Sequence, residues 1–163
     1  MAGFGEKDLT KAMSWTRKAA LQGFVDAQLN MGHFYYNGGH TAATHPDRGG
    51  AIARAARENA MPLNYREALN WYQMASRQGS VSANIHISEI YQNGKGVERN
   101  LEKSLMWILV AERNSPLKDT PRIDKIEKIK RDISTEIGSE KVKKAKFLAE
   151  ICTDTNHLLC GYE

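Results

Sequence analysis

The chain has 163 residues, of which 41% are hydrophobic and 26% are charged, and its formal net charge is +4. This composition is typical of an ordinary soluble globular protein, and it excludes a fibrous or largely disordered polypeptide. No stretch approaches the roughly 18 consecutive apolar residues of a membrane-spanning helix, so we expect no membrane span.

The first predicted helix carries Ala12, Trp15 and Ala19 at spacings of three and four, which place them on one face. The sequence starts directly before this helix, in the middle of the repeat described below. We therefore expect it to be truncated, and the lack of secretory-signal features in its first residues carries little weight.

The second predicted helix follows a turn at Gly23 and places Ala27, Met31 and Tyr35 on one face. The pair Asn37-Gly38 then ends the helix, because both residue types adopt the left-handed conformation readily. The two helices form an antiparallel hairpin.

A polar insertion follows at about residues 39–62, with loop composition and a possible short helix over 51–59. Insertions in repeat proteins often lie on the binding face, and the alternative is a tolerated surface loop. We propose as partner contacts His40, His45, Asp47, Arg48, Arg54 and Arg57. His33, His40, His45 and Asp47 lack the helical spacing of a metal site, so we favour solvent-facing side chains and expect no metal.

The landmarks of the hairpin return further along the chain. Trp71 lies 56 residues after Trp15 and Trp107 lies 36 residues after Trp71, which gives a period of 36 and a 20-residue insertion. One such hairpin cannot bury its apolar stripe, so consecutive hairpins must stack. We predict that the repeat core contains Trp15, Tyr35, Trp71, Tyr91 and Trp107.

Two amphipathic helices are predicted after Pro116. Isoleucines recur at spacings of three and four over about 121–137, and a second apolar stripe runs from Val142 to Cys152, with Ser139 as its expected N-cap. Ten basic and six acidic residues lie between 118 and 146, a surplus equal to the whole net charge. Because acidic residues are interleaved and no aromatic platform is present, we favour a solvated face over nucleic-acid or lipid binding.

This pattern resembles the SEL-one-like repeat family, relatives of the tetratricopeptide repeats, over about residues 6–114. The matching positions are Lys11, Ala12, Trp15, Ala19, Ala20, Gly23, Ala27, Met31, Gly32, Tyr35 and Gly38, then Ala68, Trp71, Ala75, Gly79, Ala83, Ile87, Tyr91, Gly94, Gly96 and Val97. Ser88 replaces a small glycine of the pattern, and Asn64 and Asn100 replace an aspartate that would cap a helix equally well.

The resemblance implies an all-α fold, a right-handed α/α solenoid in one domain spanning 1–163. Its repeat units are expected at about 6–38, 63–96 and 97–114, and its C-terminal capping helix pair at about 121–163.

The two cysteines, Cys152 and Cys160, allow more than one state. On an unbroken helix they would lie roughly 12 Å apart, which is beyond disulfide reach, so a bond requires the turn that residues 153–156 can supply. Cysteine-rich relatives in this family bridge helices at the same separation, which favours a disulfide over free thiols and implies an oxidising compartment. Zinc with His157 is disfavoured because a fourth ligand is missing.

No motif of a known nucleophile, metalloprotease or phosphate loop is present, so we expect no enzyme activity and no cofactor. The resemblance implies a scaffold with a protein partner and no nucleic acid. Its best specific form is a periplasmic immunity protein that neutralises a type VI secretion lipase effector. The alternatives are an envelope, signalling or host-interaction adaptor, or a cell-wall-active hydrolase related to cysteine-rich relatives. A periplasmic or secreted bacterial location is favoured over the cytoplasm, and the sequence does not predict an oligomeric state.

Overall fold

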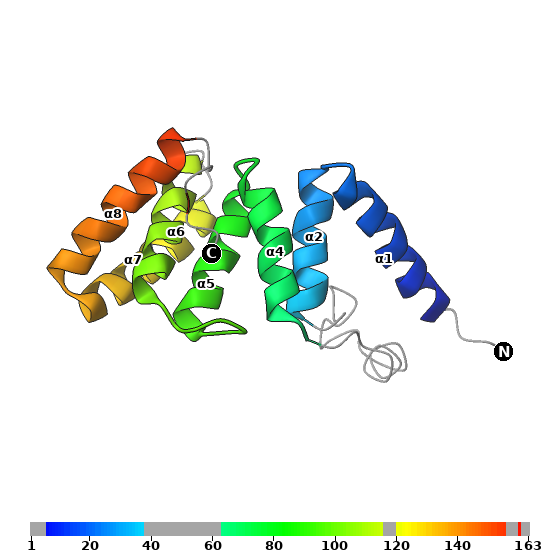
Figure 1. Cartoon of the computed structure of the whole chain (residues 1–163), viewed down its shortest axis with the longest axis horizontal. Helices are drawn as coiled ribbons and strands as arrows, with labels where there is room; N and C mark the ends of the chain where they lie inside the picture. Colours follow the sequence, from blue (N-terminus) through cyan, green and yellow to red (C-terminus); the bar gives the residue numbers. More distant parts are fainter. Residues whose placement is uncertain (1–5, 38–62, 116–119, 156–159, 161–163) are drawn as a thin grey trace. The chain divides into compact units, whose positions relative to one another are not determined.

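The computed structural model describes residues 6–37, 63–115, 120–155 and 160. In these residues the chain forms seven α-helices and no strands, which confirms the predicted all-α fold class (Figure 1). Of the described helices, none is long and apolar enough to cross a membrane. The chain divides into two compact units, residues 1–71 and 72–163, with the division falling inside helix α4.

The first unit is built on a helical hairpin of α1 (Glu6–Leu21) and α2 (Val25–Tyr36), together with the start of α4 (Tyr65–Ser76). Gly23 turns the chain between α1 and α2 with φ of 95°, a left-handed conformation that glycine adopts without strain. The core of this unit contains five buried side chains, Ala20, Ala27, Met31, Phe34 and Trp71. The large indole of Trp71 therefore packs on small and apolar residues of the preceding hairpin.

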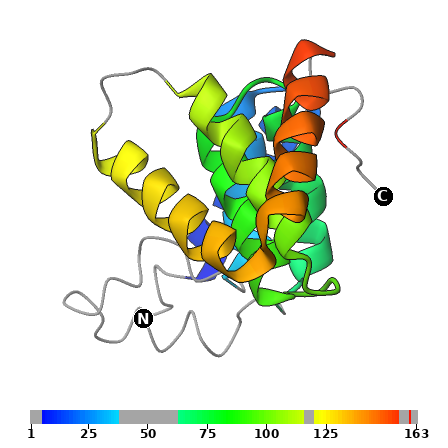
Figure 2. The same ribbon diagram turned by 90° about the vertical axis from the view of Figure 1, so that its left-hand side faces the viewer.

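The second unit contains the end of α4, α5 (Val81–Asn93), α6 (Leu101–Asn114), α7 (Thr120–Ile137) and α8 (Ser139–Asp154). Helix α6 is central, because it packs against α5, α7 and α8 and buries every residue from Ser104 to Ala111. Figure 2 shows α7 (yellow) and α8 (orange) meeting at one end and diverging from it, with α6 between them. The predicted C-terminal helix pair is present, and it packs on α6.

Side chains satisfy the exposed backbone donors at several helix starts. Asn64 accepts a hydrogen bond from the N–H of Glu67 at 3.1 Å, and Asn100 accepts one from the N–H of Lys103 at 2.9 Å. Both asparagines therefore perform the capping role that the sequence predicts. At the C-terminal end of α5, Gly94 adopts the left-handed conformation with φ of 64°.

The prediction that Trp15 lies in the repeat core is wrong. Its side chain is 68% exposed, whereas those of Trp71 and Trp107 are 7% and 1% exposed. Trp71 is covered by the hairpin that precedes it, and no described residue covers the corresponding face of α1. The ring of Trp15 instead lies under the ammonium of Lys18, at 4.6 Å.

The prediction that Ser139 caps α8 is also wrong. Ser139 is the first residue of α8, and Gly138 occupies the N-cap position with φ of 79° and no side-chain capping bond. The sharp turn between α7 and α8 requires this positive φ, which glycine alone adopts readily, so the helix starts one residue earlier than capping preference predicts.

Candidate functional site

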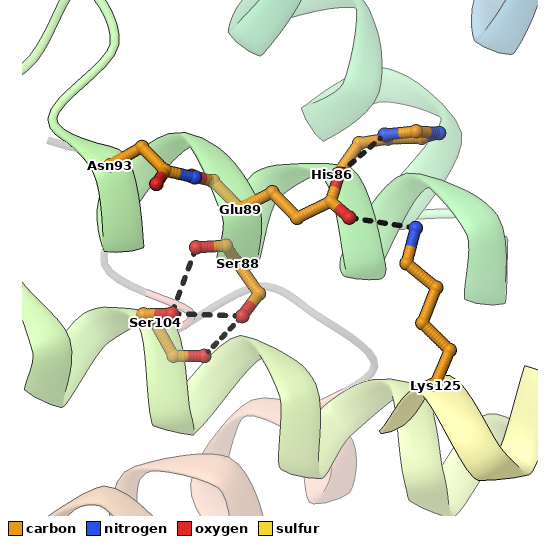
Figure 3. Close-up of polar contacts among 6 residues, drawn as sticks. All are labelled: His86, Ser88, Glu89, Asn93, Ser104 and Lys125. Atoms are coloured by element: carbon orange, nitrogen blue, oxygen red, sulfur yellow. Dashed lines mark hydrogen bonds and ion pairs between the residues drawn. The ribbon is translucent and has the colours of Figure 1, made fainter. Parts of the chain in front are cut away.

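A polar stripe on α5 faces the start of α7. Ser82, His86 and Glu89 follow one another at spacings of four and three, which places them on one side of the helix. Glu89 Oε1 contacts Lys125 Nζ of α7 at 2.7 Å, and Glu89 Oε2 lies 3.1 Å from Nδ1 of His86. Figure 3 shows the Lys125 side chain extending from α7 toward α5, where it meets the carboxylate.

The carboxylate of Glu89 is held in its ionised form. Burial raises the pKa of this group, but hydrogen bonds from His86 and Lys125 outweigh burial and lower it to about 2. An ionised carboxylate accepts hydrogen bonds and cannot donate them, so Nδ1 of His86 is the donor in this contact. With such a low pKa and both oxygens engaged, Glu89 is a poor general base near neutral pH.

The imidazole of His86 is also fixed by an aromatic neighbour. It stacks on the ring of Tyr72 in α4, with ring centroids 5.0 Å apart and planes inclined by 16°. The ring is thus held from its face by Tyr72 and from its edge by Glu89, which fixes its orientation at the surface of α5.

A pocket of about 310 Å³ lies between α5 and the start of α7. Its lining combines basic, hydroxyl and apolar side chains from the two helices, namely Ser82, Ile85, His86, Pro121, Arg122 and Lys125. Of the described residues that line it, none carries a carboxylate. The pocket is therefore suited to an anionic group rather than to a cation.

The helix that carries the stripe is fixed to α6 by a pair of serines. Ser88 Oγ donates to the carbonyl oxygen of Ser104, and Ser104 Oγ donates to that of Ser88, both at 2.8 Å (Figure 3). Both residues are fully buried. Because small residues let the two backbones approach, the polar groups of each helix satisfy those of the other.

Ion pairs also connect α7 and α8 to the hairpin of α5 and α6. The pairs are Arg99–Glu136 at 2.9 Å, Arg113–Glu150 at 3.0 Å, Lys130–Glu112 at 2.7 Å and Lys144–Glu102 at 2.7 Å. Most of their side chains are well exposed, so each pair contributes little stability. A second cavity of about 550 Å³ lies beside Arg99 and Glu136, and its lining contains both acidic and basic side chains, which give no preference for one charge.

Among the described residues, no group of three or more His, Cys, Asp or Glu side chains could hold a metal ion. The predicted disulfide between Cys152 and Cys160 is present, with a Cα–Cα distance of 4.6 Å and both residues buried. Helix α8 ends at Asp154, so Cys160 lies beyond the end of the helix that carries Cys152.

None of the six predicted partner contacts lies in the described part of the chain. His40, His45, Asp47, Arg48, Arg54 and Arg57 lie outside the described residues, as do the short helix expected over 51–59 and His157. Of the remaining predicted residues, His33 and Tyr35 are half-buried on α2, and Tyr91 is buried at 4% exposure on α5.

The cluster of His86, Glu89 and Lys125 was missed by the sequence analysis, which considered histidines near the insertion. Two signals were available for it. His86 and Glu89 stand three residues apart in a predicted helix, and Ser82 precedes His86 by four. The contribution of Lys125 had no local signal, because it depends on the packing of α7 beside α5.

Comparison with known proteins gives the following matches. A family model described as "Sel1 repeat" matches more than half of the chain, at residues 2–24, 25–43, 55–80 and 81–113. Among solved structures, a Sel1 repeat protein from Oxalobacter formigenes is similar, with 21% sequence identity and a TM-score of 0.39. The similarity covers 87% of this chain and 64% of that one, so the chain spans less than two thirds of that protein's length. No curated protein matches the chain.

Proposed function

Because the chain belongs to the Sel1 repeat family, we propose that it is a non-enzymatic scaffold that binds another protein. Sel1 repeats are generally protein–protein interaction modules. Stacked helical hairpins suit this function, since they present an extended surface on a rigid core. The observation that carries the proposal is the pocket between α5 and α7, in which ordered charged side chains lie at the surface of a well-packed hairpin.

The partner that we propose is a toxic lipase effector of a type VI secretion system, with the chain as its periplasmic immunity protein. The resemblance to SEL-one-like repeat proteins suggests that role, and the Cys152–Cys160 disulfide supports an oxidising compartment. The chain then acts by covering the effector's active site or its route to lipid, which needs affinity but no chemistry. The insertion at 39–62, with Arg54 and Arg57, is the second proposed contact region.

A binding and inhibition assay tests this proposal. The purified, oxidised chain is mixed with lipase effectors encoded beside Sel1 repeat genes, and complex formation and ester hydrolysis are measured together. The cognate lipase should lose its activity at an equimolar ratio, whereas a lipase from an unrelated secretion system should not. Normal growth of cells that lack the chain while they are attacked by an effector-producing strain would contradict the immunity role. The general scaffold function would then remain open to an envelope, signalling or host-interaction partner.

A further inference from the structure

We propose that the pocket between α5 and α7 binds an acidic side chain, aspartate or glutamate, of the partner protein. This inference rests on the proposed function as a protein-binding scaffold and adds the chemistry of one contact. It concerns only residues of the second unit.

The wall of the pocket carries basic side chains. Arg122 and Lys125 bring two permanent positive charges to the pocket wall from α7, and Ser82 adds a hydroxyl donor from α5. The carboxylate of Glu89 contacts Lys125 and His86 with its two oxygens and offsets one of these charges, so the wall keeps one net positive charge. An incoming carboxylate would accept charge-assisted hydrogen bonds from the wall, which are about twice as strong as neutral ones.

The pocket combines apolar and basic surface. Its volume of about 310 Å³ leaves room for one acidic side chain. Ile85 and Pro121 supply apolar contacts beside the basic groups. A glutamate or aspartate side chain has the matching combination of short methylene stem and charged end, whereas a bare inorganic anion would leave the apolar surfaces unused.

One basic side chain of the pocket is ordered before any ligand binds. Lysine loses much rotational freedom when it is ordered, but the ion pair with Glu89 orders Lys125 before any ligand arrives. The reciprocal hydrogen bonds of Ser88 and Ser104 fix α5 against α6. An acidic side chain therefore meets a lysine that is already ordered, and this lowers the entropic cost of binding.

The test uses the full oxidised chain and a defined probe, an N-acetylated hexaglutamate peptide, with inorganic phosphate as a second ligand. Chemical shifts of backbone amides are followed by NMR during titration with each ligand. We expect the peptide to shift the amides of residues 82–86 and 121–125. Replacement of either basic residue, Arg122→Gln or Lys125→Gln, should weaken peptide binding about tenfold, because each removes a hydrogen bond to a charged group.

Lys143→Gln is the matched control, because it removes the same charge from an α8 side chain that is 73% exposed and paired within its own helix. It should leave peptide affinity unchanged. Equal weakening by the control, or shifts scattered over α7 and α8, would overturn the proposal in favour of general attraction to basic surface. Tighter binding of phosphate than of peptide at the same amides would overturn the assignment to an acidic side chain.

The titration of the wild-type chain does not depend on any variant folding correctly. It also does not depend on the lipase effector. A failed lipase assay with a positive titration would therefore reject the effector and keep the pocket assignment, and the reverse result would reject the pocket alone.

Discussion

Ser88 on α5 and Ser104 on α6 donate hydrogen bonds to each other's main-chain carbonyl oxygen, each at 2.8 Å, and their hydroxyl oxygens lie 2.9 Å apart. Both positions hold small residues in the repeat pattern, and Ser88 stands where that pattern has glycine. The structure shows how a hydroxyl is accommodated there. The added polar group finds a partner across the helix contact, so the buried donor is not left unsatisfied.

Removal of either hydroxyl should destabilise the second unit. We expect Ser88→Ala and Ser104→Ala each to lower the free energy of unfolding by about 1 kcal/mol, the usual net contribution of one hydrogen bond. The double variant should cost less than the two single losses added together, because the serines act as a pair. Urea denaturation followed by circular dichroism measures these changes. The exposed Ser14→Ala is the control, and an equal effect there would contradict the assignment.

Replacement of tryptophan by alanine should lower stability by unequal amounts at two equivalent repeat positions. Trp71→Ala removes a side chain that is 7% exposed and packed against Met31 and Phe34, so we expect a loss of about 3 to 5 kcal/mol. Trp15→Ala removes a side chain that is 68% exposed and should cost about 1 kcal/mol or less, largely the contact with Lys18.

The measurement is thermal and urea unfolding of the two variants beside the wild type. Quenching by acrylamide gives an independent check, because a Trp71→Phe, Trp107→Phe variant retains only the exposed indole. Comparable destabilisation by the two alanine replacements, or a protected Trp15, would show that α1 is covered in solution.

The repeat register and the helical hairpins could be predicted from the sequence because they depend on local spacing. Gly23 and Gly79 turn the chain with positive φ. Helix α7 lies where the spacing of the isoleucines predicts it, and α8 contains the second predicted stripe, Val142 to Cys152. The capping role of Asn64 and Asn100 was also predictable, because each side chain bonds to a main-chain N–H only three residues later. These features need no knowledge of distant packing.

The exposure of Trp15 and the cluster at Glu89 could not be predicted in the same way. A repeat position gives the type of a residue, but its burial depends on whether a neighbouring hairpin covers it. Glu89 and Lys125 are 36 residues apart, and they meet because α6 packs against both α5 and α7. Such a contact follows from tertiary packing, for which one sequence gives no direct signal.

The ion pair of Glu89 should make stability depend on acid pH. Its pKa in the folded chain is about 2, below the value of 4.5 for the free side chain. A lowered pKa means that the unfolded chain binds the proton more tightly, so the stabilisation is complete above about pH 4.5 and is lost as the pH falls toward about 2. Glu89→Gln should remove about 2 to 3 kcal/mol of this pH-dependent stability.

Free energies of unfolding measured for the wild type and Glu89→Gln across this range test the prediction. Glu140→Gln is the control, since its side chain is 84% exposed and pairs with Lys143 in the same helix. The control curve should follow the wild type. If the Glu89→Gln curve also ran parallel to the wild type down to low pH, the carboxylate would not be held by His86 and Lys125 in solution.

Reduction of the disulfide should destabilise the C-terminal end of the second unit. Cys152 and Cys160 are eight residues apart and both buried, and closing so short a loop restricts the unfolded chain by about 2 to 3 kcal/mol on the chain-entropy model. We expect the oxidised protein to unfold at a higher temperature than the same protein in dithiothreitol.

A Cys152→Ala, Cys160→Ala variant should be insensitive to the reductant and should resemble the reduced wild type. Alanine is preferred to serine because Cys152 is fully buried, where an unpaired hydroxyl would add its own cost. Detection of two free thiols in denatured, unreduced protein purified from an oxidising compartment would contradict the bond and remove its support for a periplasmic location.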